Sequence, residues 1–118
     1  MDFEDIQLPV LRSKYVSKIK IIFEILKNNK QRYVAAYLFG SCSRGTTRFG
    51  SDVDICLVIP DDIPRFSISD IVAEIIDDYS DVHADCVVLR ESTFEKATTK
   101  LIQEMQRDKL LLMKGDRS

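Results

Sequence analysis

Apolar residues recur along this chain at two spacings, which predict where helices and strands form. In residues 13–28 and again in residues 67–79 they return every three or four positions, the spacing of a helix with one buried face. Shorter apolar runs of strand length occur in residues 33–39, 52–59 and 82–89. A proline-bounded loop, residues 60–64, separates the second strand from the second helix.

The last third of the sequence predicts one more helix. Ser92 is followed three positions later by Glu95, the pattern of a capping box, and we expect a third helix from Ser92 to about residue 106. Residues 110–113 form either a short final strand or the end of that helix. The order strand, strand, helix, strand, helix predicts an α/β or α+β fold, a mixed sheet with helices packed mainly on one face.

Length and composition place the whole chain in a single domain. Its 118 residues are 45% hydrophobic, enough for one core and too few for two. We expect one domain over residues 1–118, with a core of about residues 13–113.

The charge balance argues against a nucleic-acid partner. The chain has 17 basic and 19 acidic residues and a formal net charge of −2, so it lacks the basic field that draws proteins to nucleic acids. The basic residues in and after the first helix are expected to form a solvated face; they are Arg12, Lys14, Lys18, Lys20, Lys27, Lys30 and Arg32.

The sequence predicts a cytoplasmic protein without membrane contact. No run approaches the roughly 20 apolar residues of a membrane span, and the N-terminus has no cleavable apolar segment. Three cysteines suit a reducing compartment. Because side chains alternate along strands, Cys56 and Cys86 should face opposite sides of the sheet and should not form a disulfide.

Two acidic residues open the strand predicted for residues 52–59. Side-chain alternation points Asp52 and Asp54 to the same face, with α-carbons about 7 Å apart. Asp85, on the next predicted strand, joins them if the two strands are neighbours with aligned faces. Carboxylates roughly 5 Å apart repel by about 3 kcal/mol at an effective dielectric of about 20, which favours a cation between them. Oxygen ligands of this kind favour Mg²⁺.

A glycine-containing turn precedes these acids and predicts an anion site. Gly40 lets the backbone approach a ligand closely, Ser41 offers a hydroxyl and an amide at the start of a short helix, and Arg44 adds a fixed positive charge. A Gly-Ser turn or an Asp-x-Asp pair alone is common in ordinary turns and strand ends. The interpretation therefore depends on their joint order and spacing.

That joint pattern resembles the polymerase-β-like nucleotidyltransferase superfamily. Gly40 and Ser41 are followed by ten residues, then by Asp52-x-Asp54, and about thirty residues later by Asp85. The short length is similar to the minimal nucleotidyltransferases, or MNT proteins, often encoded beside HEPN-domain partners. The resemblance covers roughly residues 15–113.

The resemblance implies a role for each of these residues. Gly40 and Ser41 would contact the nucleotide phosphates, and Asp52 and Asp54 would hold two divalent metals, Mg²⁺ or alternatively Mn²⁺. Asp85 would complete one metal site nearest the attacking hydroxyl. The chain departs from the family at position 42, where Cys42 replaces a common basic residue. We also expect no helical second domain of the kind that larger relatives have.

The function predicted on this basis is Mg-dependent transfer of a nucleoside monophosphate, AMP in the first instance, from a nucleoside triphosphate such as ATP to a hydroxyl. By resemblance, the expected acceptor is a HEPN partner toxin, for which the chain would be the antitoxin. Two alternatives stay open: a catalytically silent antitoxin that neutralises its partner by contact, and a small-molecule or RNA-end nucleotidyltransferase. A homodimer is a further alternative for assembly.

Overall fold

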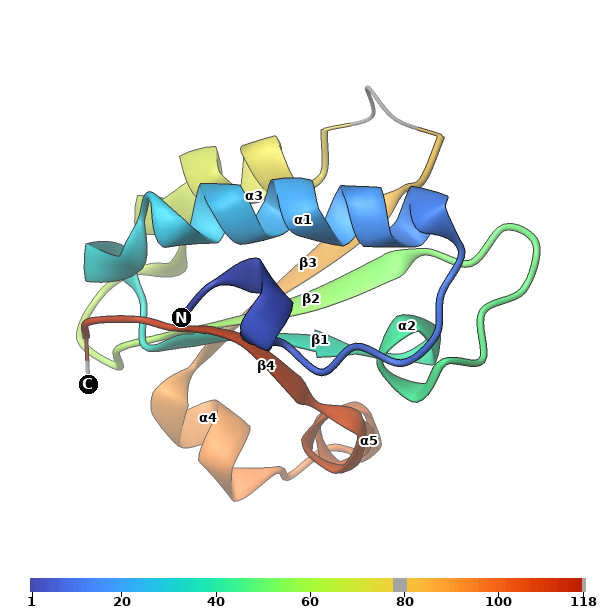
Figure 1. Cartoon of the computed structure of the whole chain (residues 1–118). Coiled ribbons are helices and arrows are strands. Elements are labelled where there is room, and N and C mark those ends of the chain that lie inside the picture. Colours follow the sequence, from blue (N-terminus) through green and yellow to red (C-terminus); the bar gives the residue numbers. More distant parts are fainter. Residues whose placement is uncertain (78–80, 118) are drawn as a thin grey trace.

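The computed structural model of the chain describes residues 1–77 and 81–117 and is built around a four-stranded sheet (Figure 1). The strands are β1 (Ala35–Phe39), β2 (Val53–Ile59), β3 (Ala84–Arg90) and β4 (Leu110–Lys114). They lie in the order β3-β2-β1-β4. β1 is antiparallel to both of its neighbours, whereas β2 and β3 are parallel, so the sheet is mixed as predicted.

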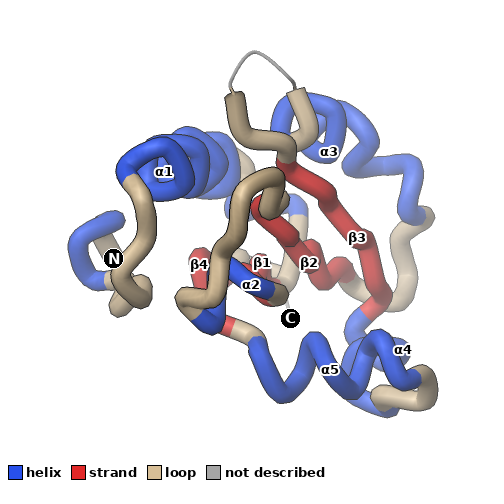
Figure 2. Tube along the Cα trace, turned by 90° about the vertical axis from the view of Figure 1, so that its right-hand side faces the viewer, coloured by secondary structure: helices blue, strands red, loops and turns tan. Residues whose placement is uncertain are grey.

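Helices lie on both faces of the sheet, one pair on each face (Figure 2). The first group is α1 (Ser13–Lys27) and α3 (Ser69–Ile75); the second is α4 (Glu91–Lys96) and α5 (Lys100–Asp108). The short α2 (Ser41–Arg44) follows β1 directly. Single 3₁₀ turns form η1 (Phe3–Asp5), η2 (Lys30–Arg32) and η3 (Arg65–Ile68). The predicted α+β class is confirmed.

The larger hydrophobic cluster lies between α1, α3 and the sheet. Side chains of α1 at helical spacing are buried in it: Tyr15, Ile19, Ile22, Phe23 and Leu26. The strands face them with alternate residues, among them Leu38, Ile55 and Leu57. Full burial of one such side chain contributes about 1.5–3 kcal/mol. This packing holds β1, β2 and β3 in place, and the candidate site lies at these strands.

The opposite face of the sheet carries a smaller cluster under α4 and α5. Its buried members are Cys56, Val58, Phe94, Ile102 and Met105. Cys86 packs instead against the larger cluster, so Cys56 and Cys86 face opposite sides of the sheet as expected, and both are free thiols. The candidate carboxylates project from this second face.

The helix predicted from residue 92 to about residue 106 is wrong in its continuity and in its cap. The segment is broken between α4 and α5, where Ala97 adopts a left-handed conformation with φ of 47°. Ser92 is not the cap, because α4 already begins at Glu91, and the Ser92 N–H instead donates to Asp61 Oδ1, outside the helix, at 3.0 Å. Thr99 is the N-cap of α5, since its Oγ1 accepts a hydrogen bond from the Ile102 N–H at 3.2 Å.

Other predicted segments agree with the structure more closely. The helix expected over residues 13–28 is α1, and residues 110–113, left open between strand and helix end, lie in strand β4. The helix expected over residues 67–79 is observed as η3 followed by α3, which ends at Ile75; its last predicted residues, 78 and 79, lie outside the described residues.

The expected solvated basic face is wrong for Lys18. Its side chain is buried, at 4% exposure, and its amino group donates to the Asp77 carbonyl at 2.9 Å. Lysine can bury its long apolar stem when the ammonium finds such a partner. In the described part of the chain, no helix is long and apolar enough to span a membrane.

Candidate active site

Asp54 and Asp85 lie side by side on neighbouring strands. They are register partners in the parallel pairing of β2 with β3, and such strands are about 4.8 Å apart. Both point to the face of the sheet that carries the smaller cluster. Cys56 and Val87, each two residues further along the same strands, belong to that cluster. Asp52 precedes β2 by one residue, and alternation places it on the same side. The pairing of Asp54 with Asp85 expected from the sequence is therefore observed.

The surroundings of Asp54 make its ionised form costly. Its side chain is half-buried, whereas that of Asp85 is exposed. Burial, joined by the negative charges of Asp85 and Asp52, raises the pKa of Asp54 from 3.8 to about 6, while Arg44 acts in the opposite direction. A cation placed among these carboxylates would relieve the repulsion.

Gly40 brings the turn after β1 directly against the Asp54 carboxylate. Phe39, the last residue of β1, is the register partner of Asp54, so the next residue passes beside the Asp54 side chain. Gly40 has φ of 74°, and a β-carbon added there would lie only 2.5 Å from Asp54 Oδ2. Both the backbone conformation and the lack of space therefore require glycine. α2 starts at the next residue, Ser41, as the sequence predicted.

Cys42 faces the interior rather than the site. Its side chain is fully buried in the larger cluster, and its thiol donates to the Asp52 carbonyl at 3.6 Å. Burial, with the nearby charges of Asp54 and Asp52, raises the pKa of the Cys42 thiol to about 11. A basic side chain in this position would be placed in an apolar environment, which accounts for the cysteine at this point of the turn.

Arg44 joins α2 to the end of α5. Its Nη1 donates to Asp108 Oδ2 at 2.5 Å, and Asp108, with a side chain only 10% exposed, also accepts from Arg107 at 3.2 Å. Asp108 is a residue that the sequence reasoning did not assign to the site. No local pattern in the sequence indicates its pairing with Arg44, because the two residues are 64 positions apart.

The segment that carries this geometry matches a known family. The nucleotidyltransferase domain family covers residues 19–112, which include the Gly40 turn, Asp52, Asp54 and Asp85. The chain belongs to this family. The resemblance inferred from the turn and the acid spacing is thereby confirmed, and the protein is a nucleotidyltransferase.

Solved structures share the fold of this nucleotidyltransferase. A candidate nucleotidyltransferase from Sulfolobus solfataricus is 24% identical with a TM-score of 0.56, and the match covers 89% of this chain and 90% of that one. A chain of a toxin–antitoxin complex with AMP-PNP is 24% identical with a TM-score of 0.58, covering 83% and 74%. A chain of the tri-AMPylated Shewanella oneidensis HEPN toxin in complex with MNT antitoxin is 23% identical with a TM-score of 0.52, covering 86% and 72%. No curated protein matches the chain significantly.

A divalent cation is the cofactor that the nucleotidyltransferase family implies, and the donor chemistry of the site fits one. Asp52, Asp54 and Asp85 offer carboxylate oxygens, and Mg²⁺ is commonly bound by one or two carboxylates, with waters and substrate phosphates completing its shell. Within residues 1–77 and 81–117, no three His, Cys, Asp or Glu side chains form a group that could hold a metal ion by themselves. A cation here would therefore need oxygen atoms from the nucleotide as well.

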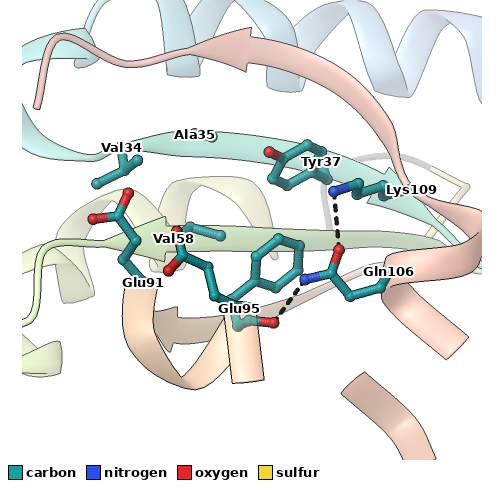
Figure 3. A pocket seen from close by; sticks show the side chains of 9 residues that line it. Val34, Ala35, Tyr37, Val58, Glu91, Glu95, Gln106 and Lys109 are labelled. Atoms are coloured by element: carbon teal, nitrogen blue, oxygen red, sulfur yellow. Dashed lines mark hydrogen bonds between the residues drawn. The ribbon is translucent and has the colours of Figure 1, made fainter. Parts of the chain in front are cut away.

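A cavity of about 350 Å³ lies on the same face of the sheet as the carboxylates. Figure 3 shows the side chains that line it. Its lining comes from β1, β2, α4 and the region where α5 ends: Val34, Ala35, Tyr37, Val58, Glu91, Phe94, Glu95, Gln106 and Lys109. Along β2, the fully buried Cys56 stands between Asp54 and the cavity residue Val58 on this face. The cavity is thus separated from the carboxylates by packed side chains.

Proposed function

We propose that this nucleotidyltransferase moves AMP from ATP to a hydroxyl group of a HEPN-domain protein and thereby acts as its antitoxin. The observation that carries the proposal is the pairing of Asp54 with Asp85 beside the Gly40 turn. The fold neighbours support the choice of nucleotide and acceptor, because one is a toxin–antitoxin complex with AMP-PNP and another contains an AMPylated HEPN toxin with its MNT antitoxin.

In this proposal the three aspartates and the turn have separate tasks. Asp52 and Asp54 hold one or two Mg²⁺ ions, for which Mn²⁺ could substitute. When bound, such an ion neutralises phosphate charge and orients the triphosphate. Gly40 leaves the space beside Asp54 free for a phosphate oxygen, and Ser41 begins α2 next to it.

The exposed Asp85 is placed to receive the proton of the acceptor. The acceptor oxygen forms a bond to the α-phosphorus, and the bond from that phosphorus to the bridging oxygen of pyrophosphate breaks. The hydroxyl proton passes to the Asp85 carboxylate, and pyrophosphate leaves with the bonding electron pair. Exposure at the rim of the site suits a residue that must meet an incoming acceptor.

An aromatic side chain beside the site supports a protein acceptor. Phe49 is 97% exposed and lies three residues before Asp52, so their α-carbons are no more than about 11 Å apart. The turn that carries it is held by hydrogen bonds: Arg48 N–H donates to Ser51 Oγ at 2.7 Å, and the Tyr15 hydroxyl donates to the Arg48 carbonyl at 3.2 Å. Aromatic residues presented in this way are enriched in protein interfaces.

The test is the mass of a HEPN-domain protein after incubation with this chain, ATP and Mg²⁺. The natural chain should add one or more AMP groups, and Asp54→Asn and Asp85→Asn should reduce the rate at least about 100-fold. Asp62→Asn, an exposed aspartate in the loop after β2, is the matched control and should keep full activity. An unmodified HEPN protein, despite intact binding and the natural chain, contradicts the proposal.

The position of Phe49 gives a second arm to this test. Phe49→Ser should weaken binding of the HEPN protein about tenfold or more and leave nucleotide binding unchanged. Phe66→Ser is the matched control, because Phe66 is also strongly exposed, at 76%, but follows the other end of β2. Equal effects of the two substitutions would remove the argument for a protein acceptor at this rim.

Neutralisation by contact is the second candidate function, favoured by one observation. The described carboxylates do not by themselves form a complete metal site. If contact is sufficient, Asp54→Asn and Asp85→Asn will still suppress HEPN toxicity in cells, and the HEPN protein will keep its unmodified mass. Loss of protection with either variant, while the complex still forms, rejects this alternative.

A further inference from the structure

The cavity between α4, α5 and the sheet has an apolar floor and an aromatic wall. Val34, Ala35 and Val58 form the floor from β1, β2 and the residue before β1 (Figure 3). The rings of Tyr37 and Phe94 stack with centroids 5.3 Å apart and an interplanar angle of 19°. With about 350 Å³, the cavity is at the small end of the range for ligand sites, which suits a side chain or a small molecule.

Two carboxylates in the lining lack partners. Glu91 and Glu95 stand one turn apart on α4, and among the described residues neither makes a hydrogen bond or an ion pair. Glu91 is half-buried, so its charge is only partly solvated. Like charges four residues apart on a helix also repel each other. A cation bound between them would relieve both effects.

The cation already present does not neutralise these acids. Lys109 Nζ donates to Gln106 Oε1 at 2.9 Å and lies 5.3 Å from the centroid of the Tyr37 ring and 5.4 Å from that of Phe94. The Gln106 amide is in turn bound to the Phe94 carbonyl at 2.6 Å, which holds this wall in place. In Figure 3 Lys109 lies at one end of the cavity and Glu91 at the other. The unneutralised charge of the cavity is therefore negative.

A nucleotide is an unsuitable occupant. Its triphosphate would be repelled by Glu91 and Glu95. Along β2, the α-carbon of the cavity residue Val58 lies about 13 Å from that of Asp54, whose carboxylate is proposed to engage the nucleotide. The fully buried Cys56 blocks the direct path along the sheet. The cavity is thus separate in place and in charge from the reaction site.

We propose that this cavity is a second binding site, which takes an ammonium or guanidinium group carried on an apolar stem. The stem lies over Val34, Ala35 and Val58, and the cation lies between the Glu91 and Glu95 carboxylates. Two sources share this chemistry: a free alkylamine or polyamine, and a lysine or arginine side chain of a bound protein. The site is independent of the transfer reaction and goes beyond it.

The test is a titration of the full chain, followed by ¹H–¹⁵N and aromatic NMR signals, with butylguanidinium as probe and butanol as the matched probe without charge. Butylguanidinium should shift signals of Glu91, Glu95 and Tyr37 with a dissociation constant in the millimolar range, about 1 mM for a ligand of this size. Butanol should bind at least tenfold more weakly. A peptide with a central arginine between glycines separates the sources: tighter binding of the peptide indicates a protein side chain, and tighter binding of the free cation indicates a small molecule.

Substitutions decide whether the carboxylates are responsible. Glu91→Gln with Glu95→Gln should weaken butylguanidinium binding at least tenfold, and Glu74→Gln, on α3 at the opposite face, should leave it unchanged. Absence of saturable shifts, equal binding of butanol, or binding unaffected by the double substitution overturns the proposal. So does a shift pattern centred on Asp54 and Asp85, which would place the cation at the other acids. None of these readouts depends on nucleotidyl transfer, so the proposal can fail while the transfer function stands.

Discussion

A single glycine shapes the carboxylate site at the residue scale. Gly40 has φ of 74°, and a β-carbon added there would lie only 2.5 Å from Asp54 Oδ2. Any other residue would have to move the carboxylate that is central to the proposed chemistry. The requirement for glycine thus concerns the position of Asp54 as well as the turn itself.

The substitution Gly40→Ala should therefore be damaging in two ways. We expect a loss of about 1–3 kcal/mol in unfolding free energy, from backbone strain and from the clash, and a loss of transfer activity because Asp54 is displaced. Gly50→Ala is the matched control: it has φ of 82°, but a β-carbon there meets nothing within 4 Å. Urea denaturation and transfer assays on both variants check this, and equal activity losses would show that strain alone is responsible.

The raised pKa of Asp54 predicts how stability depends on pH without a cation. Because the folded state holds this proton more tightly than the unfolded state, the contribution of Asp54 to stability is greatest below pH 3.8 and falls as pH rises to about 6. The unfolding free energy of Asp54→Asn should thus equal that of the natural chain near pH 4. At pH 7 it should be higher by on the order of 1 kcal/mol, after allowing for solvent screening. Thermal unfolding across this range checks it. A gain that is the same at both pH values would point to another cause.

The sequence indicates which residues are candidates for the site, but it indicates their contacts less well. Alternation along a strand is a local rule, and it predicts that Asp52 and Asp54 share one face; Asp52 is close enough for its charge to help raise the pKa of Asp54. The pairing of Asp54 with Asp85 also depended on strand order and register, which local patterns do not determine; it was expected only on the condition that β2 and β3 are neighbours. The ion pair of Arg44 with Asp108 joins residues 64 positions apart, and no local signal shows that contact.

At the scale of elements, the segment from Ser92 to Gln106 shows where pattern reasoning failed. Serine and glutamate at capping-box spacing were present, but β3 extends to Arg90 and the helix begins before Ser92 could cap it. The break after α4 depends on Ala97 in a left-handed conformation, for which alanine gives no signal because glycine is the usual residue there. By contrast, α1 and β2 followed from long apolar patterns that tertiary packing reinforced.

Ala97 offers a direct test of this description. Ala97→Gly should raise the unfolding free energy by about 0.5–1 kcal/mol, because glycine adopts φ of 47° without steric cost. Lys96→Gly, one residue earlier and inside α4, should instead lower it by about the same amount. Chemical denaturation of both variants separates the cases. A loss of stability in Ala97→Gly would mean that the helix break lies elsewhere.

At the scale of the whole molecule, the two faces of the sheet have different tasks. The larger cluster, under α1 and α3, provides most of the burial, and the smaller face carries both the carboxylates and the cavity. The described carboxylates do not complete a metal site alone. Metal and nucleotide should consequently bind to the chain as a unit.

This predicts a specific pattern of thermal stability. Mg²⁺ alone or AMP-PNP alone should shift the melting temperature little, whereas the two together should stabilise the chain by about 2.7 kcal/mol when the complex is present at 100 times its dissociation constant. Asp54→Asn should abolish this joint effect, and Asp62→Asn should keep it. A full shift with Mg²⁺ alone would mean that the protein provides a complete metal site without nucleotide.

The cysteines have a practical consequence for following such a complex. Burial raises the pKa of Cys42 to about 11 and the pKa values of Cys56 and Cys86 to about 12, so hardly any native thiolate exists at neutral pH. A new cysteine at an exposed position, such as Asp62→Cys, should therefore react with a maleimide dye far faster than the native ones. Fluorescence energy transfer to a labelled partner can then be recorded on a chain that keeps all of its own sulfur atoms.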